Sequence, residues 1–387
     1  MRSFLEKFID KNYIIRSRAG EPSALFLGEP PWDYYFLRNL DEKEYPKYLA
    51  KIFNYRTGEK LPLSNGVIDK KRCKTFNQKI QWIKLYGVTD LMRDCTDKVK
   101  VRDYVREKIG EEYLKPVLQI IPESHETLRC HCEQVNDNLG LARQSTDRSN
   151  DKMDCHADIE MSSSARNDRV LVFKDNDNKN NDVTTYFDQV NFDKLPNSFV
   201  IKCNHGCKWQ YIIKDKNEFL KNKRLFELIK RNITCWLEQD YSFWGGFELN
   251  YRRIEPKILI EPLMREEINT PCRQIQIYCF NNLPKFIVEI HNDKEITVYD
   301  ENLVIIDDIF EFRENKINII ANNLTNQTIL RLSKQLVKDM NTKLVRVDWM
   351  IYQNKPYFEE FTFTPYSGFH AFKSSKNSLK LGNLIKL

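Results

Sequence analysis

The sequence has no long apolar run, and no segment approaches the ~20 consecutive apolar residues with which a helix spans a bilayer. Charged residues also interrupt its start, where Glu6, Lys7, Asp10 and Lys11 leave no apolar core for a secretory signal. Glycine and proline number only 12 and 14 among 387 residues, which excludes a collagen-like chain. The excess of positive charge is small, since 61 Lys and Arg stand against 55 Asp and Glu for a net charge of +6. That charge does not by itself indicate a nucleic-acid partner. We therefore expect a cytoplasmic protein with no transmembrane segment and no nucleic acid among its partners.

The ten cysteines include no Cys-x-x-Cys pair. In a chain without a secretory segment, free thiols are expected more than a disulfide framework. Cys130-His131-Cys132 and Cys155-His156 carry side chains that can bind metal, but a tetrahedral zinc site usually uses wider pairs than Cys-x-Cys. Free thiols are the favoured interpretation, and a zinc site is the alternative.

The composition changes along the chain. An apolar fraction of 41% and a charged fraction of 30% suit a sizeable core, and the length allows about two to three domains. Residues 1–40 are aromatic and punctuated by proline, which predicts an irregular lead-in. Residues 41–121 carry helical patterns, and strand patterns with one intervening helix begin near Leu195. This order predicts an α+β protein.

Three helices are predicted in residues 41–121. The first covers 41–55, with Asp41 as its candidate N-cap and its apolar residues on one face. The second begins at Thr75 and ends at Gly87, and the third covers 97–110.

Residues 122–184 are rich in Asn, Asp, Ser and Lys and have little apolar periodicity. Such a segment cannot bury enough surface to offset the entropy lost on ordering, so we predict a largely disordered insertion. Within it, only Val170–Phe173 has the composition of a short strand.

Alternating patterns predict a strand over 198–203, a turn leading to a second strand within 205–215, and strands over 257–264 and 275–290, the last with a hairpin turn at Asn281-Asn282. A helix is predicted over 328–341. Residues 344–365 then form two predicted strands joined by a turn at Gln353-Asn354.

This last hairpin carries candidate catalytic residues. Arg346 and Asp348 share one face of its first strand, and Glu360 and Thr362 share one face of its second, because alternate strand residues point the same way. Two carboxylates from adjacent strands, completed by phosphate oxygens, commonly hold Mg²⁺. Spacing alone nevertheless favours a simpler interpretation, a surface ladder of cross-strand ion pairs.

Three further residues have roles that spacing leaves open. Lys202 lies mid-strand among apolar neighbours and either reaches the surface or presents a charge to an anion. Lys98 is either a charge on a helix surface or a second phosphate ligand. His205 is either a general base or, as we favour, a turn residue bonded to backbone.

Several segments, in order along the chain, resemble one family. They are TFNQKIQWIKLYG, DKVKVRDYVREKIGEEYLKPVL, FDKLPNSFVIKCNHG, KILIEPLM, IYCFNNLPKFI, RVDWMIYQNKPYFEEFTFTPYSGF and LGNLIKL. Together they resemble the TupA-like family of ATP-grasp proteins from about Asp41 to Leu387, except over 122–184, where the family has only a short link. The resemblance implies an ATP-grasp fold with a helical N-terminal region, a long polar insertion, a lid subdomain over 185–260 and a C-terminal subdomain over 261–387. It reverses the preference for a surface ladder.

The resemblance also implies a set of nucleotide contacts: phosphates held by Lys98 and Lys202, a covering loop that begins at His205 and Gly206, the adenine edge at Glu261 and Leu263, and the ribose at Glu266 or Glu267. It implies a Mg²⁺ site made by Asp348, Glu360 and Thr362, with Arg346 as the arginine that stabilises the transition state beside it.

The chain departs from the family pattern at three places. Thr362 stands where ATP-grasp ligases often have asparagine. The predicted phosphate loop lacks the second glycine that the family usually has near Lys208. Gln274-Ile275-Gln276 stands where many members have Asp-Tyr-Lys.

The resemblance implies an ATP- and Mg²⁺-dependent carboxylate–amine ligase that works through an acyl phosphate in cell-surface polysaccharide or polymer biosynthesis. Its partners are then ATP, a carboxylate and an amine, with glycan-linked and peptide-linked molecules as candidates for the last two. Two alternatives stay open: a glycosyltransferase or glycan kinase of surface-polymer synthesis, and a non-catalytic nucleotide-binding relative.

Overall fold

The computed structural model describes residues 30–31, 33–121, 185–265, 267, 272–292, 295–306, 313–314 and 323–387. The predicted disordered insertion over 122–184, with its candidate zinc ligands, lies outside these residues, as does most of the predicted lead-in. A short helix, α3 (Tyr34–Arg38), occupies the described end of that lead-in.

Helices form much of residues 41–113, as the sequence predicts. Asp41 caps a 3-10 turn over Glu42–Glu44, and the helix α4 (Tyr45–Thr57) follows it. The helix α5 (Phe76–Tyr86) begins with a capping box between Thr75 and Gln78 and ends at Gly87, which confirms its predicted limits. The remaining elements are α6 (Asp90–Thr96), which was not predicted, α7 (Val101–Ile109) and a small hairpin of β1 (Leu63–Ser64) with β2 (Val67–Ile68).

A larger sheet follows the order β10-β9-β8-β7-β11-β12 among the described residues. Its strands are β7 (Arg273–Phe280), β8 (Leu283–Asn292), β9 (Glu295–Asp300), β10 (Arg313–Glu314), β11 (Leu344–Tyr352) and β12 (Lys355–Thr362). Both predicted hairpin turns are confirmed. Asn281-Asn282 and Gln353-Asn354 have positive φ at both residues, the backbone that a two-residue turn needs between twisted strands.

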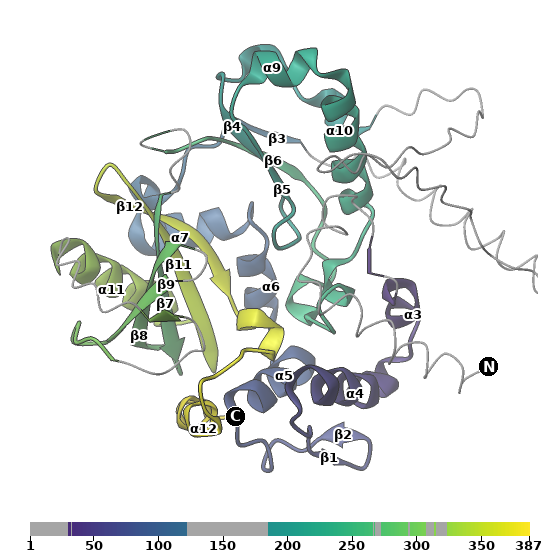
Figure 1. Ribbon diagram of the computed structural model, residues 1–387, viewed down its shortest axis with the longest axis vertical. Coiled ribbons are helices and arrows are strands. Elements are labelled where there is room, and N and C mark those ends of the chain that lie inside the picture. The colour runs from purple at the N-terminus through teal and green to yellow at the C-terminus, as the bar shows by residue number, and fades with distance from the viewer. Residues whose placement is uncertain are drawn as a thin grey trace, which may run out of the picture. The chain divides into compact units, whose positions relative to one another are not determined.

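A second sheet has the order β3-β6-β4-β5. Its strands are β3 (Gln119–Ile121), β4 (Phe199–Cys203), β5 (Gln210–Ile213) and β6 (Ile258–Pro262). The helices α9 (Lys216–Lys221) and α10 (Lys223–Leu237) flank this sheet, with α9 above the strands and α10 to their right in the view of Figure 1. Since α10 contacts β4 and Ile201 is fully buried, the adjacent residue Lys202 points to the opposite face.

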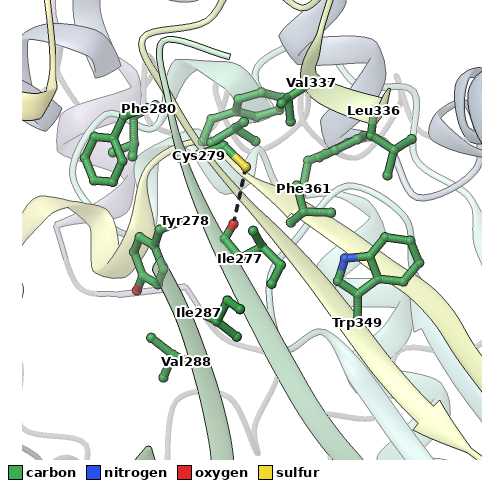
Figure 2. Close-up of a cluster of buried hydrophobic side chains, with 14 of the residues drawn as sticks. Ile277, Tyr278, Cys279, Phe280, Ile287, Val288, Leu336, Val337, Trp349 and Phe361 are labelled. Atoms are coloured by element: carbon green, nitrogen blue, oxygen red, sulfur yellow. Dashed lines mark hydrogen bonds between the residues drawn. The ribbon is translucent and has the colours of Figure 1, made fainter. Parts of the chain in front are cut away.

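The main hydrophobic core lies between the larger sheet and the helix α11 (Asn323–Val337). Figure 2 shows Leu336 and Val337 of this helix beside Cys279, Phe361 and Trp349 of the sheet. The Trp349 indole Nε1 donates to Ser333 Oγ at 2.9 Å, so this large buried side chain has its polar atom satisfied. This core fixes the neighbouring strands β7, β11 and β12, of which β11 and β12 carry the predicted metal residues.

The C-terminal helix α12 (Ser375–Leu384), capped by Ser374, packs against α5 and so joins the end of the chain to its helical region. In the part of the chain that the structure describes, none of the helices combines the length and the apolar character needed to cross a membrane.

Candidate active site

A cleft of about 650 Å³ gathers most of the predicted site residues. Its lining comes from the face of the β3-β6-β4-β5 sheet opposite α10, from β7, β11 and β12, and from the segment before α7. Seven predicted residues line it: Lys98, Lys202, Glu261, Arg346, Asp348, Glu360 and Thr362. Four others do not, namely His205, Gly206, Leu263 and Glu267.

The predicted metal residues converge on the strands β11 and β12. Asp348 lies directly opposite Glu360, and Arg346 lies opposite Thr362. The Thr362 hydroxyl is 3.3 Å from Asp348 Oδ2 and 3.5 Å from Glu360 Oε1. The four polar groups therefore form one cluster inside the cleft, as the resemblance implied, and not a ladder on the surface.

A β-bulge produces this register. The two-residue turn pairs Trp349 with Phe358, but the next pair is Asp348 with Glu360, so Glu359 is an extra residue on β12. A strict antiparallel register would place Glu359 opposite Asp348. Because of the bulge, Glu359 and Glu360 both line the cleft although they are consecutive residues.

Arg346 holds Asp348 in a bidentate pair. Its Nε donates to Asp348 Oδ1 at 2.7 Å and its Nη2 to Oδ2 at 2.6 Å, and both side chains are nearly buried. Burial raises the pKa of Asp348 to about 6 against the opposing effect of Arg346, with Glu360 and Glu359 adding to the rise. The cluster therefore carries more negative charge than one guanidinium balances comfortably at low dielectric, which favours a bound cation.

The donor set suits Mg²⁺. Asp348 and Glu360 supply carboxylate oxygens and Thr362 a hydroxyl, all hard oxygen ligands of the kind this ion takes. Within the described ranges, no group of three or more His, Cys, Asp and Glu side chains could hold a metal ion by itself. A cation here would complete its shell with oxygens from a ligand, as Mg²⁺ does with nucleotide phosphates.

A buried ion-pair network that includes Glu359 also lines the cleft. The Glu261 carboxylate accepts from Lys202 Nζ at 2.7 Å and lies 3.2 Å from Lys115 Nζ, which also contacts Glu359 at 2.5 Å. Burial works to raise the pKa of Glu261, yet Lys115 and Lys202 outweigh it and hold that pKa at about 2. Two ammonium groups thus stand at the cleft surface where a polyphosphate could contact them.

Lys98 joins this site from the helical region. Its Nζ donates to the Gly206 carbonyl at 2.6 Å, and its backbone N–H donates to the Asn204 carbonyl at 3.2 Å. Asn204 is itself fixed by donating to Asp97 Oδ1 and to the Glu255 carbonyl, both at 2.9 Å. Lys98 is therefore not a free charge on a helix surface but is tied to the predicted phosphate loop.

The His205 side chain is buried away from the cleft lining. Its Nε2 lies 3.0 Å from the Trp236 carbonyl, and burial lowers its pKa to about 4, so the ring is neutral at physiological pH. This position agrees with a turn residue bonded to backbone. Position 206 requires glycine for a steric reason, because a Cβ there would lie 2.2 Å from the buried ring of Trp209. Its carbonyl, and not a side chain, faces Lys98.

The predicted adenine hinge follows the strand β6. The Leu263 N–H donates to the Ser198 carbonyl at 3.4 Å, so it extends the pairing of β6 with β4. Glu267 is exposed, and Glu266 lies outside the described residues. The hinge and ribose roles stay predictions.

Sequence reasoning did not identify Lys115, Glu359, Glu248, Tyr241 or Tyr251, which also line the cleft. Thr364 Oγ1 donates to the buried Glu248 carboxylate, and burial raises the pKa of this group. The rings of Tyr241 and Tyr251 pack together with centroids 4.6 Å apart. Tyr241, Glu248 and Tyr251 come from one segment of 3-10 turns, whereas Lys115 and Glu359 lie far from it along the chain, so no spacing rule connects the whole set.

The family departures at Gln274 and Gln276 are also in the cleft. Gln276 lies opposite Asp348 in the pairing of β7 with β11, so a neutral amide stands beside the acidic cluster. Lys208, near which the family has a second glycine, has positive φ (61°) and lines the cleft.

Residues 173–386, more than half of the chain, match the TupA-like ATP-grasp family. The chain belongs to this family. The match confirms the predicted resemblance and with it the α+β ATP-grasp fold, with helices in the N-terminal region.

Solved structures of low similarity were also found, whereas no curated protein matches this TupA-like ATP-grasp chain. D-alanine–D-alanine ligase from Bacillus anthracis, complexed with ATP, is 13% identical over 83% of this chain and 75% of that chain, with a TM-score of 0.34. The ADP complex of PurK, N5-carboxyaminoimidazole ribonucleotide synthetase, is 9% identical over 83% and 57%, with a TM-score of 0.33. D-alanine–D-alanine ligase from Helicobacter pylori is 16% identical over 50% of each chain, with a TM-score of 0.28. The chain thus spans little more than half of PurK and half of the H. pylori enzyme.

Proposed function

We propose that this TupA-like ATP-grasp protein is an ATP- and Mg²⁺-dependent carboxylate–amine ligase of cell-surface polymer biosynthesis. One observation carries the proposal: an opposed pair of carboxylates, Asp348 and Glu360, lies with Arg346 in the same cleft as Lys98 and Lys202. Carboxylates for a metal and ammonium groups for phosphates are the two requirements of phosphoryl transfer from a nucleotide.

The proposed reaction has two steps. A carboxylate oxygen of one substrate attacks the γ-phosphorus of ATP, the bond to the β-phosphate oxygen breaks, and ADP leaves. The amine of the second substrate then attacks the acyl carbon, the carbon–oxygen bond to phosphate breaks, and inorganic phosphate leaves with an amide formed. The amine loses a proton, and Glu248 is a buried carboxylate of the cleft whose raised pKa suits it to accept that proton.

The residues of the chain act by positioning and by neutralising charge. Lys98 and Lys202 would contact the phosphates, and Arg346 would stabilise the charge that develops on the transferred group. Asp348, Glu360 and Thr362 would hold Mg²⁺, which when bound supplies a positive charge between the phosphate oxygens. No covalent nucleophile on the protein is required.

The test is calorimetry with Mg·ATP followed by a screen of carboxylate and amine acceptors for ADP release. Asp348→Asn and Glu360→Gln should each abolish acceptor-dependent ADP release while leaving the melting temperature near that of wild type. Glu301→Gln, which alters an exposed carboxylate paired with Lys285, is the matched control and should leave turnover unchanged. Wild-type turnover in both Asp348→Asn and Glu360→Gln would refute the metal assignment.

Product analysis separates the alternatives. A ligase releases ADP and inorganic phosphate together, whereas a glycan kinase releases ADP and keeps the phosphate on its product. Turnover of a sugar nucleotide without consumption of ATP would indicate a glycosyltransferase. Tight Mg·ATP binding without turnover for any acceptor would indicate a non-catalytic relative.

A further inference from the structure

The junction between α9 and α10 exposes an unusual run of residues. Leu220–Leu225, with the sequence Leu-Lys-Asn-Lys-Arg-Leu, is exposed at every position. The run has three cations, no acid and a leucine at each end. We call Leu220–Leu225 together with Leu228 the basic corner.

The leucines of the basic corner are not part of the core. Leu220, Leu225 and Leu228 have 39%, 38% and 39% of their surface exposed, whereas the buried face of α10 begins at Ile229. Leu225 and Leu228 are neighbours on the helix surface because they are three residues apart. Arg224 is four residues before Leu228, so an apolar and a cationic side chain alternate across this surface.

Positive charge concentrates in the same place. Residues 214–231 hold seven Lys or Arg against three Asp or Glu, while the whole chain has a net charge of only +6. Two of these cations serve the fold, since Lys216 Nζ donates to the Leu195 carbonyl at 2.6 Å and Lys230 pairs with Asp188 at 2.5 Å. Lys223 and Arg224 form no ion pair with any residue that the structure describes. Glu227, on the next turn of α10, offsets part of the charge.

The basic corner lies on the side of its sheet away from the cleft. The helix α10 contacts β4 on the face where Phe199 and Ile201 are buried, and Lys202 and Gln210 line the cleft from the other face. Figure 1 shows α9 and α10 on the outer side of the β3-β6-β4-β5 sheet. A large partner bound at the corner would leave the cleft open.

We propose that the basic corner binds the surface of an anionic lipid bilayer. The leucines would enter the boundary between headgroups and acyl chains, and Lys221, Lys223 and Arg224 would contact lipid phosphates, as basic amphipathic segments do at membrane interfaces. The presence of exposed leucines beside the cations favours a lipid surface over a nucleic acid. A nucleic acid would be bound through the cations alone and would not require the leucines. The proposal does not depend on the ligase activity.

The test is co-sedimentation of the full chain with vesicles. Wild type should bind vesicles of phosphatidylcholine mixed with phosphatidylglycerol, bind phosphatidylcholine alone much more weakly, and be released by salt. Lys223→Gln with Arg224→Gln should weaken binding about 25-fold, since each cation near an anionic surface contributes about a factor of five. Leu225→Gln with Leu228→Gln should weaken binding as well, with an unchanged melting temperature and unchanged Mg·ATP affinity.

The matched control is Leu379→Gln with Lys380→Gln on α12, where Leu379 is 40% exposed and Lys380 follows it. This variant should bind vesicles like wild type. Three results would overturn the proposal: no vesicle binding by wild type, equal binding to neutral and anionic vesicles, or full binding by the leucine variant. Binding to duplex DNA is measured for the same variants. If the protein binds DNA tightly without the leucines and does not bind vesicles, the basic corner is a nucleic-acid site instead.

Discussion

Replacing Lys115 by methionine is the sharpest test of the buried network in the cleft. The Lys115 ammonium contacts Glu261 at 3.2 Å and Glu359 at 2.5 Å, and the side chain is only 8% exposed. Methionine keeps most of the volume and removes the charge. Glu261 would keep Lys202 at 2.7 Å, but Glu359 would lose the only ion-pair partner that it has among the described residues.

The size of the effect follows from the pKa of Glu261. Burial opposes its ionisation, but Lys115 and Lys202 lower its pKa from 4.5 to about 2. At about 1.4 kcal/mol per pKa unit, this shift corresponds to ~3 kcal/mol of stability at neutral pH, which the two lysines contribute together. Removing one member of a buried ion pair typically costs ~3–5 kcal/mol. We therefore expect Lys115→Met to lower the free energy of unfolding by about 3 kcal/mol at pH 7.

The pH dependence has a definite sign. A carboxylate whose folded-state pKa is lowered stabilises the fold above its unfolded-state pKa and loses that contribution as the pH falls through the folded value. Glu261 has an ordinary pKa of 4.5 and a folded-state pKa of about 2. Burial works to raise the pKa of Glu359, but Lys115 and Lys202 outweigh it and lower that pKa as well. The deficit of Lys115→Met should therefore be largest at neutral pH and shrink below about pH 4.5.

The assay is urea denaturation of wild type, Lys115→Met, Glu359→Gln and the double variant. The double variant should lose less stability than Lys115→Met alone, because no lone carboxylate remains in the interior. Lys108→Met is the control, since Lys108 pairs with Asp339 at 3.1 Å on the surface and should contribute less than about 1 kcal/mol. A Lys115→Met variant within about 0.5 kcal/mol of wild type, or a deficit that does not change with pH, would contradict the reasoning.

Two further predictions concern Lys202, to which the proposal assigns phosphate binding, and Gly206 of the predicted phosphate loop. Lys202→Met should weaken Mg·ATP binding measured by calorimetry, because it removes an ammonium group that lines the cleft, and an affinity equal to wild type would exclude the phosphate role. Gly206→Ala should lower the free energy of unfolding by about 1–3 kcal/mol in urea denaturation, because the added methyl would lie 2.2 Å from the Trp209 ring, which stacks against Trp236 and cannot easily move. Unchanged stability in Gly206→Ala would mean that the loop relaxes freely.

The acidic hairpin of β11 and β12 shows how much of the candidate site could be predicted from the sequence alone. Strand alternation and the two-residue turn correctly brought Arg346, Asp348, Glu360 and Thr362 together. The register itself could not be predicted, because the strict pairing set by the turn would place Glu359 opposite Asp348. The bulge that corrects it depends on packing against neighbouring strands and leaves no local mark in the sequence.

The role of Lys115 could not be predicted from the sequence, for a different reason. Its partner Glu359 is 244 residues away along the chain, and its other partner lies on β6. Only the folded topology brings these groups together. The helix α10 was not predicted either, although the sequence contains its signal. Ile229, Ile233 and Trp236 follow the helical period.

The helical N-terminal region belongs to the site and does not merely precede it. The family match covers residues 173–386, yet Lys98 and Lys115 lie outside that range and both line the cleft. Asp97 accepts from the Asn204 side chain at 2.9 Å, so the same region also holds the start of the predicted phosphate loop. A chain reduced to the matched range would keep the acidic hairpin, but Glu261 and Glu359 would face each other with Lys202 as the remaining ammonium of the network. The charge balance of the cleft therefore requires both parts of the chain. The hairpin supplies carboxylates to the site, and the helical region supplies cations to the same site.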